Sequence, residues 1–185
     1  MTETAKPQLH YRKPSARDGG SVWELIRDAK TLDLNSSYSY LMLCDMFQDT
    51  CCLAETGEEL AGFVSAFRKP SDPNTLFVWQ IGVSSAQRGK GIGKGLIKAL
   101  LSRPENADIS FMEATIGPDN IASRQLFMSL SNELGGSCNM SEHFDSTMFP
   151  GEKKHDDELL FRIGPLKLDR ISAPAPSIPL KEETK

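Results

Sequence analysis

The sequence predicts a single α/β domain in which helices flank a central sheet, and three observations support this. The chain has 185 residues, of which 39% are hydrophobic and 25% charged, an ordinary composition for one globular domain. Segments with the two-residue period of strands alternate with segments with the 3.6-residue period of helices. One continuous apolar strand, LFVWQIGV, leads through a glycine-rich loop into an amphipathic helix, as in a strand–loop–helix unit.

The first half of the chain predicts a short strand, two helices and a hairpin. LHYRKP is the short strand, and SVWELIRDA places its apolar residues on one helical face. LDLNSSYSYLMLCDMF offers three cap-type residues before an apolar stretch, so we expect a linker and a short helix there. CCLAE and LAGFVSAF are β-rich, and the TGEE between them suits a tight turn.

The second half continues with helix and strand patterns that become irregular near the end. LFVWQIGV follows the turn-forming PSDPN, and IGKGLIKALLSRP predicts a helix that ends before proline. ISFMEATIG predicts a strand, Asn120 can cap the helix that follows, and glycines end that helix. Residues 137–157 show no regular pattern, so we expect a long loop there before a last strand, ELLFRIG. We expect residues 1–10 to be a flexible leader, 11–168 the domain, and 169–185 a Pro-rich disordered tail.

Charge, cysteines and hydropathy restrict the function classes. The net charge of −4 disfavours a broad surface for nucleic acid or acidic membranes. We see no signal peptide and no apolar run near the ~20 residues of a membrane span, so a cytoplasmic location is expected. The four cysteines form no CxxC pair and the three histidines are scattered, so we predict no metal site and reduced, buried thiols.

The loop QRGKGIGKG has glycine at every second position, which lets backbone N–H groups approach a ligand closely. A P-loop is excluded, because Gly95 stands where Ser or Thr is required and Arg88 where a glycine is required. A GxGxxG dinucleotide fingerprint fails as well, since Lys94 or Leu96 occupies the place of its last glycine. What remains is R-x-x-G-x-G before a helix N-terminus, which suits a pyrophosphate, with added charge from Arg88, Lys90 and Lys94.

This strand, loop and helix resemble the acetyl-CoA-binding motif of the GCN5-related N-acetyltransferases. Asn120 and Ser123 also match the asparagine and small residue that this family places near the pantetheine arm. The resemblance implies a central mixed, mostly antiparallel sheet flanked by helices, with acetyl-CoA in the cleft between the two central strands. The cofactor-binding residues that it implies are Ile81, Val83, Arg88, Gly89, Lys90, Gly91, Gly93, Lys94, Asn120, Ser123 and Phe127.

The sequence departs from that family at Phe127. Many members carry a tyrosine seven residues after the asparagine, and its phenol protonates the departing thiolate. A phenylalanine cannot donate a proton. Either water or a hydroxyl elsewhere, with Tyr38 as one candidate, protonates the thiolate, or a different element supplies the acid.

Four further segments indicate one branch of this family: LDLNSSYSYLMLCDMF, TLFVWQIGV, TIGPDNIAS and HDDELLFRIGPL. From about Tyr11 to Leu166 the chain is similar to the branch that acetylates the γ-amine of L-2,4-diaminobutyrate in ectoine biosynthesis. This implies a cytoplasmic, dimeric enzyme for a small-molecule substrate that supports osmotic stress tolerance.

A substrate with two ammonium groups needs anionic and aromatic partners, and the same segments provide them. The candidate substrate-binding residues are Asp33, Tyr38, Trp79, His155 and Glu158. An aliphatic ammonium has a pKa near ~10.4, so a base must remove its proton. The catalytic candidates are Glu158, His155, Tyr38 and, in a strand beside the expected cleft, Glu113.

Each candidate also has a purely structural interpretation. Trp79 can belong to the core, Asp33 can cap a helix, and Tyr38 can cover the core with its hydroxyl in water. His155 and Glu158 can form a solvated loop and a salt bridge, and Glu113 can be an ordinary paired carboxylate in a strand.

The expected mechanism is direct attack of the neutral amine on the thioester in a ternary complex, without a cysteine nucleophile. A backbone N–H near Ile81 to Val83 would stabilise the oxyanion. Two alternatives stay open: a same-fold acetyltransferase for another small amine or a protein N-terminus, and a non-catalytic acetyl-CoA-binding regulatory module, which Phe127 would suit. A protein substrate needs an open groove, whereas the segment MFPGEKKHDDE is expected to cover the site.

Overall fold

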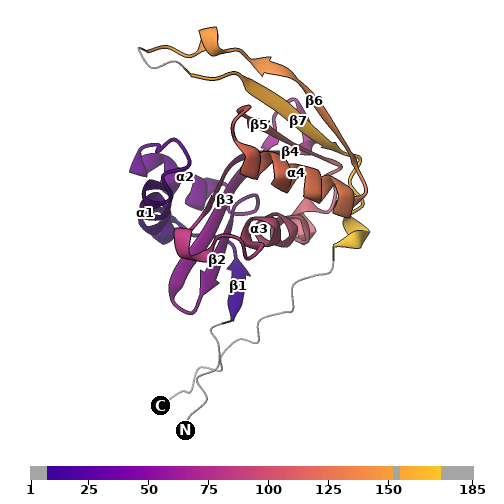
Figure 1. The fold of residues 1–185 in the computed structure, drawn as a ribbon. Coiled ribbons are helices and arrows are strands. Elements are labelled where there is room, and N and C mark those ends of the chain that lie inside the picture. The colour runs from indigo at the N-terminus through magenta and orange to yellow at the C-terminus, as the bar shows by residue number, and fades with distance from the viewer. Residues whose placement is uncertain (1–7, 152–154, 172–185) are drawn as a thin grey trace, which may run out of the picture.

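The computed structural model describes residues 8–151 and 155–171, which form one seven-stranded sheet with helices on both faces (Figure 1). The strand order is β1-β2-β3-β4-β5-β7-β6, and every neighbouring pair is antiparallel except β4 and β5. The strands are β1 (Leu9–Arg12), β2 (Cys52–Thr56), β3 (Glu59–Lys69), β4 (Asp72–Val83), β5 (Phe111–Ile116), β6 (Ser137–Phe144) and β7 (Glu158–Gly164). The α-helices are α1 (Gly19–Ala29), α2 (Ser37–Met46), α3 (Ile92–Leu101) and α4 (Ile121–Leu134).

The alternation of side chains along the strands creates a separate core on each face of the sheet. Cys51, Leu53 and Phe63 pack under α1 and α2, whereas Cys52 and Val64 pack under α3 and α4. The two adjacent cysteines therefore enter opposite cores. All four cysteines are free thiols, and burial raises the pKa of Cys51 and of Cys52.

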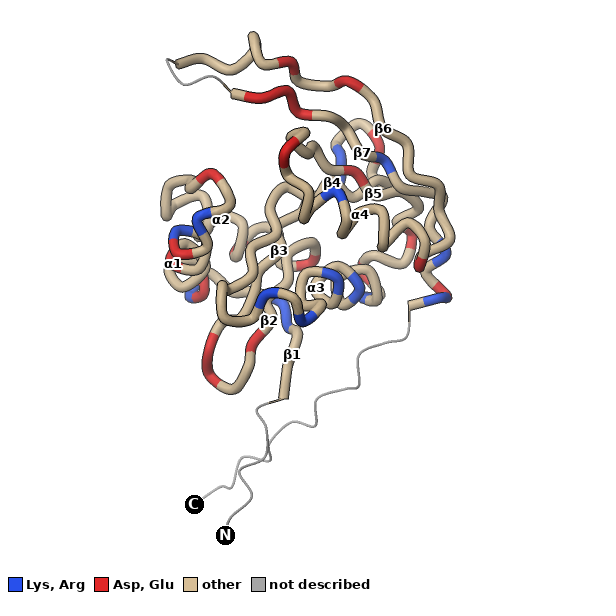
Figure 2. The backbone as a smooth tube through the Cα atoms, in the orientation of Figure 1, with Lys and Arg blue, Asp and Glu red and all other residues tan. Residues whose placement is uncertain are grey.

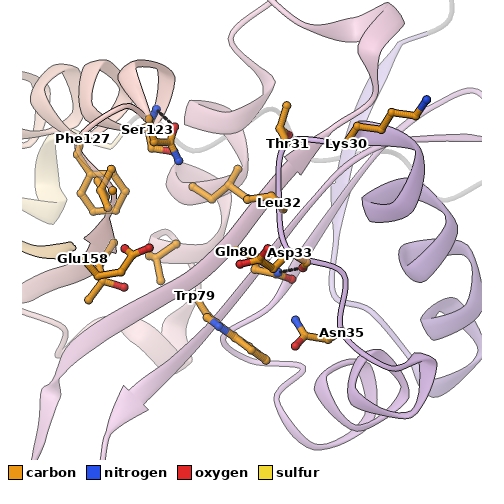
Figure 3. Close-up of a pocket in the computed structure, with 17 residues that line it drawn as sticks. Lys30, Thr31, Leu32, Asp33, Asn35, Trp79, Gln80, Ser123, Phe127 and Glu158 are labelled. Atoms are coloured by element: carbon orange, nitrogen blue, oxygen red, sulfur yellow. Dashed lines mark hydrogen bonds between the residues drawn. The ribbon is translucent and has the colours of Figure 1, made fainter. Parts of the chain in front are cut away.

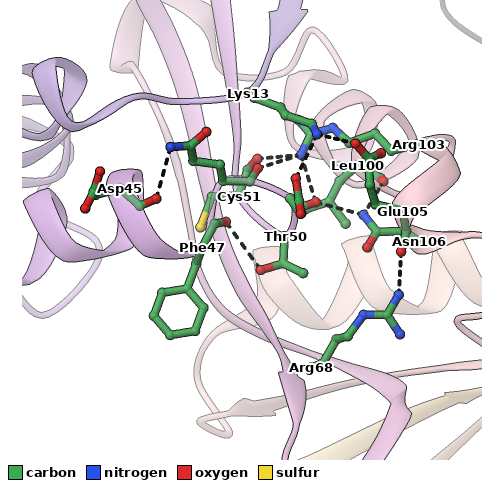
Figure 4. A network of polar contacts seen from close by, with 12 residues as sticks. Lys13, Asp45, Phe47, Thr50, Cys51, Arg68, Leu100, Arg103, Glu105 and Asn106 are labelled. Carbon is green, nitrogen blue, oxygen red and sulfur yellow. Dashed lines mark hydrogen bonds and ion pairs between the residues drawn. The ribbon is translucent and has the colours of Figure 1, made fainter.

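The end of α3 is joined to the start of β2 by a polar network (Figure 4). The Arg103 guanidinium donates to the backbone carbonyls of Gln48, Asp49 and Cys51 at 2.7–3.0 Å. The buried Asn106 side chain donates to Asp49 and to Leu100. A buried carbonyl without a hydrogen-bond partner destabilises the fold. By supplying donors to these carbonyls, the network holds the α2–β2 connection against the end of α3.

The parallel pair β4–β5 is short, and this shapes the centre of the molecule. Ladder partners run only from Thr75 to Phe77 opposite Phe111 to Glu113. Farther along, β4 continues beside β3, with one extra residue, Trp79, between the partners of Ser65 and Ala66. Such a bulge bends its strand and interrupts pairing. The two central strands therefore separate beyond Phe77.

Two glycines of the QRGKGIGKG loop are required for different reasons. Gly91 caps α3 with φ 76°, in the left-handed region that favours glycine. Gly95 lies inside α3, where a Cβ would approach the Tyr11 hydroxyl to 1.9 Å. Gly95 is therefore a packing glycine, whereas Gly91 shapes the loop.

Most predicted elements agree with the structure, and two differ. Asp72–Asn74, expected as a turn, are the first residues of β4. The expected irregular segment 137–157 contains β6, which pairs with β7 and extends from the body of the fold (Figure 1). Nearly all residues of β6 are exposed, so the strand carries no apolar alternation that could predict it.

The structure describes only part of each end of the chain. Residues 1–7 and 172–185, on which the expected leader and Pro-rich tail mostly fall, lie outside the described residues. Leu9 and His10 belong to β1, in agreement with the predicted strand LHYRKP but within the predicted leader of residues 1–10. Leu168–Arg170 form a short 3₁₀ helix. Among the described helices, none has the length and apolar character needed to cross a membrane.

Candidate active site

An inner pocket of about 560 Å³ opens where β4 and β5 separate (Figure 3). Its walls are β4 from Val78 to Ile81, β5 and its following turn from Ala114 to Gly117, and the α1–α2 loop. Helix α4 closes one side and Glu158, the first residue of β7, lies at the edge. The interrupted ladder thus supplies a cavity at the centre of the sheet.

A second cavity of about 530 Å³, the loop pocket, adjoins the inner pocket and is lined by the glycine loop and α3. Five residues line both cavities: Thr31, Leu32, Ile81, Asn120 and Ser123. The two cavities therefore form one continuous groove. All eleven predicted cofactor residues except Lys90 line one cavity or the other.

The cations of the glycine loop are bonded within the protein rather than free. Arg88 donates to the carbonyl of Ala29 at 2.7 Å, Lys90 donates to Gln87 at 2.8 Å, and Lys94 donates to Ser129 at 2.7 Å. Lys94 and Lys98 also form ion pairs with Glu133, and Figure 2 shows these basic residues along α3. The cationic side chains expected to add positive charge are therefore held by bonds within the protein, and the backbone N–H groups at the start of α3 are the main feature suited to an anion.

Helix α4 presents three of the predicted residues to the groove. The Asn120 side chain caps the helix by accepting from the Ser123 N–H at 3.1 Å. Ser123 and Phe127 are one turn apart and both line the inner pocket. Phe127 is 2% exposed, so it forms an apolar wall where a tyrosine hydroxyl would otherwise stand.

Three of the predicted substrate residues come together in the inner pocket: Asp33 from the α1–α2 loop, Trp79 from the β4 bulge, and Glu158 (Figure 3). Trp79 is 44% exposed, so it is a pocket wall rather than a core residue.

Glu158 is the titratable group of this pocket whose environment is most unusual. Burial raises the pKa of the Glu158 carboxyl above its ordinary value. The charges of Asp33 and Asp156 raise this pKa further, whereas His155 and the Thr115 hydroxyl oppose the shift. Glu158 forms no ion pair with any residue that the structure describes. A half-buried carboxylate that no salt bridge neutralises is suited to accept a proton.

Two other predicted residues lie outside both cavities. Tyr38 is 67% exposed on the first turn of α2, so the structure does not support its role as an acid or a substrate contact. The His155 ring stacks on Phe149 with 3.7 Å between centroids, and its Nδ1 lies 2.6 Å from the Asp156 carbonyl. His155 therefore affects the pocket through its electrostatic effect on Glu158 rather than as part of the wall.

Glu113 requires a correction, because it is a structural carboxylate. It is 2% exposed on β5 and pairs with Lys69 at 2.7 Å and with Arg162. Burial alone would raise the pKa of Glu113, but hydrogen bonds from the two cations outweigh this, and the pKa lies below its ordinary value. Glu113 lines neither cavity. It is not placed to act as a base.

Sequence reasoning missed Gln80, Thr115 and Asn35, which also line the inner pocket. Gln80 gave a usable signal, because it is the one polar residue in the apolar strand LFVWQIGV. Thr115 and Asn35 gave none, since both residue types are ordinary in a strand and in a loop.

Comparisons with known proteins agree with this geometry. Residues 20–130 match the acetyltransferase (GNAT) family. The chain is 46% identical over 154 residues to the L-2,4-diaminobutyric acid acetyltransferase of Virgibacillus pantothenticus, covering 83% of this chain and 96% of that protein. It is 42% identical over 164 residues to the enzyme of the same name from Halomonas elongata, covering 88% of this chain and 84% of that protein.

A solved structure gives the same result. The diaminobutyrate acetyltransferase EctA from Paenibacillus lautus, in complex with its substrate L-2,4-diaminobutyric acid and coenzyme A, superposes with a TM-score of 0.83 at 45% identity. The match covers 86% of this chain and 96% of that one. The predicted fold is confirmed. The chain therefore belongs to the acetyltransferase (GNAT) family and, within it, to the L-2,4-diaminobutyric acid acetyltransferases.

Proposed function

We propose that this chain transfers the acetyl group of acetyl-CoA to the γ-amine of L-2,4-diaminobutyrate, giving N-γ-acetyl-diaminobutyrate and CoA in ectoine biosynthesis. The observation that carries the proposal is one groove with two chemically distinct ends. The glycine loop lines one end, and Glu158, Asp33 and Trp79 line the other. Family membership supports the same reaction.

The loop pocket suits acetyl-CoA. The N-terminus of α3 and the backbone N–H groups around Gly91 favour the pyrophosphate. Ile81 and Ser123 line both cavities, so an acyl group bound between the separated strands would meet the inner pocket there. The edge of β4 beyond Phe77 has no ladder partner on β5, which suits a backbone N–H near Ile81 to Val83 as oxyanion donor.

The inner pocket suits a small diamine with one carboxylate. Asp33 and Glu158 provide negative charge for two ammonium groups, and the Trp79 ring provides an aromatic face. The volume of the pocket, about 560 Å³, accommodates a small amino acid together with the end of a thioester.

Glu158 is the proposed general base. Its raised pKa makes it a stronger base than an exposed glutamate. It accepts a proton from the γ-ammonium, and the freed amine attacks the thioester carbon. The N–C bond forms, the nitrogen releases its second proton to water, the C–S bond breaks, and CoA leaves as a thiolate. Water protonates that thiolate, because Phe127 has no proton to give and Tyr38 lies outside the groove.

The first experiment measures thiol release from acetyl-CoA with L-2,4-diaminobutyrate, ornithine and lysine as acceptors, and NMR identifies the acetylated nitrogen. Turnover should be fastest with diaminobutyrate and give the γ-acetyl product, because one or two extra methylenes misplace the amine. Equal rates with the longer amines would indicate another small-amine acetyltransferase. Binding of acetyl-CoA without turnover would indicate a regulatory module.

We also propose that two copies form a homodimer in the cytoplasm, where acetyl-CoA is available. Three exposed apolar side chains support self-association: Met140 and Phe144 on β6, and Met148 in the short 3₁₀ helix Ser146–Met148 that follows it. Light scattering should give twice the chain mass. Met140→Lys, which places a charge on β6, should lower the measured mass toward that of one chain.

A further inference from the structure

The α1–α2 loop, residues 30–36, carries Asp33 into the inner pocket but has no ladder or helix to hold it. Such a loop keeps a side chain in place only where other groups bind its backbone. Among the described residues, three side chains from other elements form hydrogen bonds with the loop backbone: Gln80, Tyr40 and Trp23.

Gln80 is the central member of this set. It is 6% exposed on β4, next to the bulged Trp79. Its Nε2 donates to the Asp33 carbonyl at 2.8 Å (Figure 3). Its Oε1 accepts from the Tyr40 hydroxyl at 3.1 Å. The orientation of the amide is determined by chemistry, because a carbonyl can only accept and the nitrogen must face it.

The remaining contacts hold the loop two residues farther along. The Tyr40 hydroxyl accepts from the Asn35 N–H at 3.4 Å, and the Trp23 indole donates to the Asn35 carbonyl at 3.2 Å. Tyr40 is fully buried, so its hydroxyl depends on these partners. Gln80 thus connects the floor of the pocket to the loop at Asp33 directly and at Asn35 through Tyr40.

The other end of the loop is held separately. Arg88 of the glycine loop donates to the Ala29 carbonyl at 2.7 Å, just before Thr31 and Leu32, which also line the loop pocket. Loss of the Gln80 bond therefore acts on the acceptor side of the groove and leaves the tether on the acetyl-CoA side in place.

We infer that Gln80 is a positioning residue for the acceptor amine, acting through Asp33. This inference rests on the proposed function. By fixing the Asp33 backbone, Gln80 fixes the distance between the Asp33 and Glu158 carboxylates across the pocket. Two ammonium groups on one short carbon chain require such a fixed separation, so acceptor affinity depends on a side chain that need not touch the acceptor.

The test compares two substitutions, one that removes the Gln80–Asp33 hydrogen bond and one that removes the hydrogen bonds of the Tyr40 hydroxyl. Gln80→Glu keeps an acceptor for Tyr40 but removes the donor to Asp33, whereas the control Tyr40→Phe keeps the Gln80–Asp33 bond. Gln80→Glu should raise the KM for diaminobutyrate about tenfold and change the KM for acetyl-CoA less than about twofold. Tyr40→Phe should change both values less than about threefold. Gln80→Met, which removes donor and acceptor without adding charge, should behave like Gln80→Glu.

A double-mutant cycle with Asp33→Asn separates positioning from general loss of structure. If Gln80 acts through Asp33, Gln80→Met should change the acceptor KM less than about twofold once Asp33→Asn is present. Full additivity of the two effects would overturn the inference, as would an equal rise in both KM values.

Hydrogen exchange of the unliganded protein gives a reading that needs no turnover. Amides of residues 32–36 should exchange faster in Gln80→Met than in the wild type, while amides of α3 keep their protection. Unchanged exchange in the loop would overturn the inference. Absence of turnover by the wild type would instead overturn the proposed function and leave this measurement valid.

Discussion

The two ends of the β4–β5 junction place the same residue type in opposite environments. Where the strands pair, Glu113 is buried between Lys69 and Arg162, and its pKa lies below the ordinary value. Where they separate, Glu158 lies at the edge of a pocket with acidic neighbours, and its pKa lies above that value. Burial raises the pKa of both carboxyls, but only at Glu113 do two paired cations outweigh that effect, whereas at Glu158 burial prevails.

This difference separates the structural carboxylate, Glu113, from the proposed general base, Glu158. Two cations stabilise the ionised form of Glu113, which holds β3, β5 and β7 together and leaves it a weak base. Burial, with smaller contributions from Asp33 and Asp156, destabilises the ionised form of Glu158, and this favours proton uptake.

The largest expected effect is that of Glu158→Gln on catalysis. Loss of the general base should lower kcat by about 10² to 10³-fold, with little change in the KM for acetyl-CoA. Because the folded-state pKa of Glu158 is raised, its ionised form destabilises the fold at neutral pH, so the Tm should not fall. Steady-state kinetics and calorimetry measure both quantities. A kcat within about threefold of the wild type would exclude Glu158 as the base.

Glu113→Gln is the matched control, and we expect the reverse pattern. Removing the carboxylate leaves Lys69 and Arg162 beside a neutral amide, at a cost of about 2 kcal/mol because both cations are partly exposed. The Tm should fall by about 4–8 °C. In the folded protein, kcat should stay within about twofold of the wild type. A hundredfold loss of activity in a folded variant would make Glu113 a candidate general base again.

The pH dependence sharpens the comparison further. Activity should be lost as the pH falls through the pKa of Glu158, and this acid limb should lie above the ~4.3 of an unperturbed glutamate. Asp33→Asn removes a neighbouring negative charge and should move the limb to lower pH, since that charge raises the pKa of Glu158. The profile of kcat/KM against pH measures this shift. A limb that does not move would mean that another group controls it.

The smallest expected effect is that of Phe127→Tyr. A thiolate is a comparatively stable leaving group, so a nearby hydroxyl should change kcat less than about threefold. The new hydroxyl would lie on a wall that is 2% exposed and could cost about 1 kcal/mol of stability unless it meets a partner. Kinetics of the variant with diaminobutyrate test this. A tenfold gain would show that protonation of the thiolate limits the reaction.

Periodicity predicted the elements with a buried face and failed for those without one. The stripe of α3 and the continuous apolar β4 agree with the structure, because burial requires those patterns. β6 was not predicted, because most of its residues are exposed and show no apolar alternation. Only its backbone pairing with β7 defines it as a strand.

The candidate site shows the same division. Asp33, Trp79 and Glu158 reach the inner pocket from three separate segments, as the resemblance implied. Tyr38, only five residues from Asp33, does not, since α2 begins at Ser37 and turns Tyr38 toward solvent. No sequence pattern distinguishes two acidic residues by the cations that folding brings beside one of them.

The sequence by itself determined the glycine loop, the amphipathic helices and the family, because spacing along the chain is enough to specify a backbone turn or a buried face. The tertiary structure decided which carboxylate is free to accept a proton and which polar side chain holds Asp33. These properties depend on charges and hydrogen-bond partners that lie tens of residues away in the chain, such as Gln80 and Asp33 or Lys69 and Glu113. Their distances are set only when β4 and β5 pair at one end and separate at the other.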